Sequence, residues 1–144
     1  MRVITKIVIL LLFLTSCSSE QEMSIPLQNE IHKTCKESVN NMRAAEIFFS
    51  RGDLPNWASK MADLESNAIE LRNLQSQVIE SQENPSIWYR MQVISLEEIG
   101  DNINSAQIAY FEWIAVQGAS SKDRISGFEY ANSMSRKCKN FSNK

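Results

Sequence analysis

Four stretches of the chain carry apolar residues at every third or fourth position, which is the spacing of one buried face on an α-helix. Short breaks separate them, and none shows the apolar-polar alternation of a half-buried strand. The spacing predicts helices over residues 27–51, 54–82, 85–117 and 121–141. Because connections this short make successive helices antiparallel, we predict an all-α, up-down-up-down four-helix bundle. A three-helix core with a loosely docked fourth segment is the alternative.

Residues typical of helix ends stand at the breaks. Gly52 suits the end of the first helix, and Asp53 is a candidate N-cap for the second. Asn84, directly before a proline, is the candidate N-cap of the third helix, and Ser120 or Ser121 that of the fourth. The inward face of the fourth helix is predicted to comprise Ile125, Phe128, Ala131, Ser135 and Cys138.

The composition of the 144 residues excludes several other classes of protein. With 4 Gly and 3 Pro the chain has few residues for the tight turns of a sandwich or barrel, and with 1 His it has little for a histidine metal site. The formal net charge is −2 and there is no Lys/Arg block, so no nucleic-acid partner is expected.

The first residues have the layout of a signal peptide. Arg2 and Lys6 form a positive region, residues 7–14 are uninterrupted apolar residues, and small residues precede Cys17. An apolar run of this length spans only about 12 Å as a helix, against a bilayer core of about 30 Å. We therefore expect residues 1–16 to be a cleaved signal peptide.

The tetrapeptide Leu14-Thr15-Ser16-Cys17 resembles the lipobox of bacterial lipoproteins, in which an apolar residue stands three positions before an invariant cysteine. The resemblance implies that the Cys17 thiol receives a diacylglyceryl group and that cleavage then frees its amine for further acylation, for example by palmitate. The protein would then be anchored in a bilayer through acylated Cys17. The alternative is an ordinary secretory peptide in which this cysteine is incidental.

Residues 17–26 then form a lipidated N-terminus and short tether, and residues 27–144 form the bundle. Ser18 and Ser19 follow the cysteine, whereas in enterobacterial lipoproteins an Asp there is the inner-membrane retention signal. By that resemblance, the periplasmic leaflet of the outer membrane is the expected location. Loss of two cations with the signal peptide changes the net charge of −2 to −4.

The two remaining cysteines are expected to form a disulfide. Cys35 and Cys138 would face an oxidising compartment, where an even pair is most simply bridged. In an up-down-up-down bundle the first and last helices are antiparallel neighbours, so these positions lie at similar heights. A metal pair or redox thiols are the alternatives, but the short spacings typical of such sites are absent.

Few residues point to catalysis, a cofactor or a bound metal. His32 has no second histidine to work with and is expected to be an exposed polar residue. The acidic cluster of Glu97, Glu98 and Asp101 is interpreted as a solvated helix face, with a Ca²⁺ site as the alternative. No phosphate-binding loop, nucleophile elbow or zinc motif occurs in the sequence. We expect a non-enzyme without a cofactor.

The sequence has more large apolar residues than one narrow buried face on each helix would need. Phe48, Trp88, Phe111 and Ile114 lie in runs of consecutive large side chains, so some are expected to face outward. These four are the candidate surface for a protein partner, with a wide core stripe as the alternative.

The sequence thus favours a membrane-anchored periplasmic lipoprotein whose bundle is a non-catalytic binding module. Secretion pilotins and chaperones offer an analogy of architecture only. The alternatives are a sensor of a small ligand or of envelope stress, and a plasmid- or phage-borne lipoprotein with an exclusion or immunity role.

Overall fold

The computed structural model describes residues 23–81, 86–116 and 125–142, except for the side chain of Trp88. These residues form four α-helices and a final 3₁₀ turn, with no strand among them. The elements are α2 (Ile25–Ser50), α3 (Leu54–Glu80), α4 (Ile87–Ala115), α5 (Gly127–Cys138) and η1 (Lys139–Phe141).

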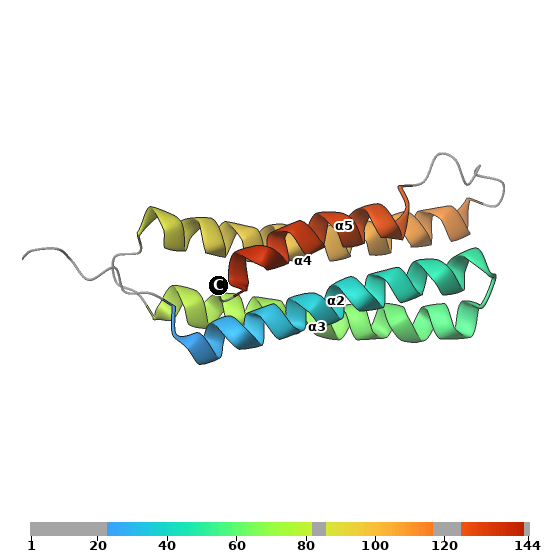
Figure 1. Cartoon of the computed structure of the whole chain (residues 1–144). Coiled ribbons are helices and arrows are strands. Elements are labelled where there is room, and N and C mark those ends of the chain that lie inside the picture. Colours follow the sequence, from blue (N-terminus) through green and yellow to red (C-terminus); the bar gives the residue numbers. More distant parts are fainter. Residues whose placement is uncertain (1–22, 82–85, 117–124, 143–144) are drawn as a thin grey trace, which may run out of the picture.

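The four helices form an up-down-up-down bundle, as predicted (Figure 1). Each helix packs against the next one in the sequence, and α5 closes the ring against α2. We call the end where α2 and α4 finish the distal end, and the end where α2 and α4 begin the proximal end. Ala131 and Met134 on α5 are fully buried, so the fourth helix is part of the core.

Two of the predicted helix ends are confirmed. Gly52 has a φ of 72°, the left-handed conformation that ends α2. The carboxylate of Asp53 accepts a hydrogen bond of 3.3 Å from the backbone N–H of Asn56 and so caps α3. At α4 the cap is Ser86, whose hydroxyl accepts from Tyr89 N–H at 3.2 Å, while the expected cap, Asn84, lies outside the described residues.

The predicted start of the fourth helix at residue 121 is wrong. Ser126 is the N-cap and Gly127 the first helical residue of α5, while residues 117–124 lie outside the described part of the chain. Ile125 and Phe128, expected to face inward, are both exposed. Spacing alone did not distinguish Ser126 from Ser120 and Ser121 as the cap, whereas in the structure the Ser126 hydroxyl accepts from Phe128 N–H at 3.2 Å.

The core runs the length of the bundle and is mainly aliphatic. Its largest fully buried side chains are Tyr89, Tyr110, Phe141, Ile31, Met42, Leu64, Leu71, Leu74, Leu96, Ile99, Ile103 and Met134. Gln92 is a polar exception: it is 2% exposed, and neither amide atom has a hydrogen-bond partner within the described residues. An unpaired buried amide costs about 1–3 kcal/mol, so this layer of the core is less stabilising than its neighbours.

Candidate functional site

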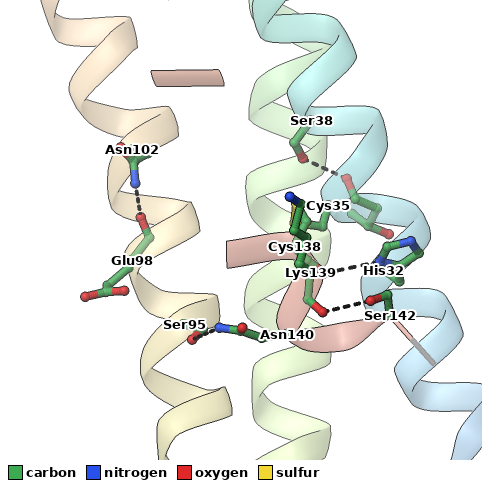
Figure 2. The surroundings of a disulfide bond; sticks show 11 residues. His32, Cys35, Ser38, Ser95, Glu98, Asn102, Cys138, Lys139, Asn140 and Ser142 are labelled. Carbon is green, nitrogen blue, oxygen red and sulfur yellow. Dashed lines mark hydrogen bonds between the residues drawn. A yellow bond between two sulfur atoms is a disulfide. The ribbon is translucent and has the colours of Figure 1, made fainter. Parts of the chain in front are cut away.

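A disulfide between Cys35 and Cys138 joins α2 to the last residue of α5 (Figure 2). The two Cα atoms are 5.7 Å apart, an ordinary separation for a bridge, and both residues are buried. The bridge links positions 103 residues apart, so it closes almost the whole bundle into one loop. It agrees with the pairing that helical phase and topology predicted.

His32 lies beside this disulfide and is half-buried, contrary to the expectation of an exposed residue (Figure 2). Its ring Nδ1 is 3.2 Å from the carbonyl oxygen of Cys138, which can only accept, so the Nδ1–H tautomer is the one that donates. The last carbonyls of a helix have no partner within the helix. His32 therefore helps to close the C-terminus of α5 against α2.

One of the three residues of the acidic cluster on α4 contacts another helix. Glu98 forms an ion pair with Lys137 of α5, while Glu97 and Asp101 are exposed. Within the described residues, no three His, Cys, Asp or Glu side chains form a group that could hold a metal ion.

A buried carboxylate that the sequence analysis missed joins three helices near the distal end. Glu46 of α2 is 4% exposed, and its Oε2 accepts from the Tyr110 hydroxyl at 2.7 Å and from the Gly127 backbone N–H at 2.8 Å. The Ser50 hydroxyl donates to its Oε1 at 3.2 Å. Because Gly127 is the first residue of α5, the carboxylate satisfies a free N–H at the positive end of that helix.

The position of Glu46 in the sequence contains a signal for its contacts with α4 and α5. Glu46 stands four residues after Met42 and one after Ala45, both buried, so helical phase alone places it on the inward face of α2. A charged residue in that phase predicts a buried partner, because an unpaired buried charge is costly.

Substitution of Gly127 by alanine is expected to destabilise the bundle by about 2 kcal/mol. An added Cβ would lie 2.9 Å from Oε2 and 3.0 Å from Cβ of Glu46, and closer still to the Tyr110 hydroxyl. Tyr110 is 1% exposed, so it has no free space into which to move. The measurement is urea-induced unfolding followed by circular dichroism.

Gly100→Ala is the matched control, because a Cβ there meets no atom within 4 Å. Alanine in the middle of α4 should stabilise the protein by about 0.5–1 kcal/mol through helix propensity. Equal effects of the two substitutions would contradict the importance of the close approach at Gly127.

Five aromatic rings pack together at the distal end. Phe49 lies 4.8 Å from Tyr110, 5.0 Å from Trp113 and 5.6 Å from Trp57, measured between ring centroids. Trp57 contacts Phe111 in turn, at 5.9 Å. These separations and tilted geometries are favourable for aromatic pairs, so the rings hold the ends of α2 and α4 to the start of α3.

The four residues predicted as a partner surface do not lie together. Phe111 is 58% exposed and Ile114 is 39% exposed, both near the distal end of α4. Phe48 is only partly exposed and packs against the core. Trp88 stands at the opposite end of α4, about 35 Å from Phe111 at 1.5 Å per residue, and its side chain is not described.

Further exposed apolar side chains lie near the distal end of the bundle. We call the following set the distal apolar surface; every member lies within about two turns of that end. It comprises Ile47, Leu54, Ile108, Phe111, Ile114, Val116, Ile125 and Phe128. Of these, only Phe111 and Ile114 were among the predicted residues; the packing of the four helices brings the others to the same end of the bundle.

Comparisons with protein-family models, with curated proteins and with solved structures find no match for this chain. Among the described helices, none is long and apolar enough to cross a membrane. The class that the structure itself defines is an all-α four-helix bundle closed by a disulfide between its first and last helices.

Proposed function

We propose that the protein is a bacterial lipoprotein of the cell envelope, anchored through acylated Cys17, and that its bundle is a non-catalytic binding module for a protein partner. The partner binds at the distal apolar surface. This proposal combines the lipobox-like residues 14–17 with the arrangement of exposed apolar residues on the bundle.

The observation that carries the proposal is the exposure of Phe111, which is one ring of the distal aromatic cluster and packs on its buried member Trp57. Its ring contacts Trp57, which is 7% exposed, so Phe111 is held on a rigid base. Rigid aromatic side chains lose little conformational entropy on binding and are frequent hot spots of protein interfaces. Clustered exposed apolar side chains are typical of interaction sites.

The position of this surface also suits a membrane-anchored protein. The α4 helix has 29 residues and is therefore about 40 Å long, which places the distal surface that far from the end nearest Cys17. A partner at the distal end would meet no obstruction from the bilayer.

A photo-crosslinking amino acid at position 111, introduced into the full chain in its own membrane, tests the proposal. We expect a discrete protein adduct from position 111. None is expected from position 69, where Ile69 is 50% exposed in the middle of α3 and outside the surface. Phe111→Asp should abolish co-purification of the adducted partner while the helical circular dichroism is unchanged. Adducts from neither position, or equally from both, would contradict the proposal.

A further inference from the structure

The fourth helix does not extend to the proximal end of the bundle. At this end of α5 and η1, Cys138 O lies beside His32 of α2, and the Asn140 amide donates to the hydroxyl of Ser95 on α4 at 3.2 Å. Beyond these contacts α2 continues to Ile25 and α4 to Ile87, roughly 10 Å at 1.5 Å per residue. Figure 1 shows the red α5 stopping short of the left-hand end. Within the described residues, α2, α3 and α4 form this part, together with Met23, which precedes α2 and is 5% exposed.

Apolar side chains continue along α4 where α5 has ended. Ser95 and Glu98 share one helix face, and both contact the C-terminal part of α5 or η1. Met91 precedes Ser95 by four residues, and Ile87 precedes Met91 by four, so both extend this face beyond its partner. Met91 is 61% exposed and Ile87 is 80% exposed.

Other helices add to the same end. We call the exposed apolar residues within about two turns of it the proximal apolar surface. Its members are Ile25, Ile79, Ile87, Met91 and Ile94. Among the described residues, Ile69 is the exposed large apolar side chain that belongs to neither end surface.

The charges around the proximal apolar surface do not favour electrostatic binding. Within the described last two turns of α2, α3 and α4 at this end, the acidic and basic side chains are Glu30, Glu80 and Arg90, and η1 adds the exposed Lys139. Two cations against two anions are not the basic patch that attracts anionic lipids. Any partner for this surface must therefore bind through apolar contact.

The kind of partner can be inferred from the distance between the proximal end of the bundle and the expected lipid anchor at Cys17. Met23, the first described residue, follows Cys17 by six positions, and six residues span at most about 20 Å. A diacylated Cys17 would therefore hold the proximal end within that distance of the lipid headgroups. Ile25 follows Cys17 by eight positions and is 65% exposed.

We propose that the proximal apolar surface contacts the lipid bilayer, so that the bundle stands on the membrane with its distal end pointing away. This inference rests on the proposed anchoring through Cys17. The surface would enter the interfacial region of zwitterionic and anionic bilayers alike, because apolar area rather than charge drives the contact. The anchor and the surface together would then set the orientation of the bundle.

Photo-crosslinking to lipid tests this proposal in the membrane-purified protein. A photo-reactive amino acid replaces Met91 in one variant and Ile69 in the control, and each protein is reconstituted into phosphatidylcholine or phosphatidylglycerol vesicles. Mass spectrometry measures the lipid adducts and the acylation of Cys17. If Cys17 is not acylated, a maleimide phospholipid coupled to its thiol supplies the anchor instead, so failure of the proposed function is seen separately from failure of the contact.

We expect several-fold more lipid adduct from position 91 than from position 69, with similar yields on both lipids and at high salt. Equal yields from the two positions in vesicle-bound protein would overturn the proposal. Adducts from position 91 to polypeptide in place of lipid would also overturn it, since the surface would then be covered by protein. Adducts restricted to phosphatidylglycerol at low salt would show electrostatic binding, against the inference.

Discussion

Replacing both Cys35 and Cys138 by serine is expected to lower the free energy of unfolding by about 4 kcal/mol. The bridge spans 103 residues, and a loop of that length restricts the unfolded chain strongly. Both positions are buried, so each serine also places a hydroxyl in the core. The measurement is urea-induced unfolding of the double variant against the oxidised parent.

The loss should be concentrated in one helix. With 12 residues, α5 is the shortest of the four, and the disulfide joins its last residue to α2. We expect its amide protons to exchange faster in the double variant, while the α2–α3 pair keeps most of its protection. The reduced parent protein is the matched control and should behave like the variant. An unchanged unfolding midpoint would contradict a stabilising role for the bridge.

A Cys17→Ser variant is expected to lose its membrane attachment or to remain unprocessed. Each buried CH₂ group of an acyl chain contributes about 0.8 kcal/mol to membrane binding, so two or more chains make attachment essentially permanent. Serine has no thiol to accept a diacylglyceryl group. In detergent phase separation the parent protein should enter the detergent phase, and processed variant protein should enter the aqueous phase.

Ser18→Ala is the control for this experiment, because it changes the neighbouring residue and leaves the thiol in place. It should partition like the parent protein. Unaltered partitioning of correctly processed Cys17→Ser would refute lipid anchoring. The release of both the parent and the variant into the aqueous phase would instead support the ordinary secretory peptide.

Much of the fold followed from the sequence because its signals are local. The spacing of apolar residues defines which face of a helix is buried, and Gly52 and Asp53 define where one helix stops and the next begins. The bridge was predictable because Cys35 and Cys138 lie on inward faces of helices that the topology makes neighbours.

The candidate surfaces were less predictable because exposure depends on what lies opposite. The spacing of apolar residues placed both Phe48 and Phe111 in the candidate partner surface. In the structure Phe48 packs against the core, whereas Phe111 is exposed. Trp88 and Phe111 looked alike as members of aromatic runs, yet one long helix separates them by about 35 Å.

By itself the sequence determined four helices, their alternating direction and the pairing of two cysteines, since each depends on residues a few positions apart or on helical phase. Only the tertiary structure decided the partner of the Gly127 N–H at the start of α5, because its acceptor, Glu46, lies 81 residues earlier in the chain. It also decided which apolar side chains remain exposed. Because the fourth helix is short, the proximal part of α4 packs against α3 but not against α5, and the spacing of residues on α4 does not reveal this.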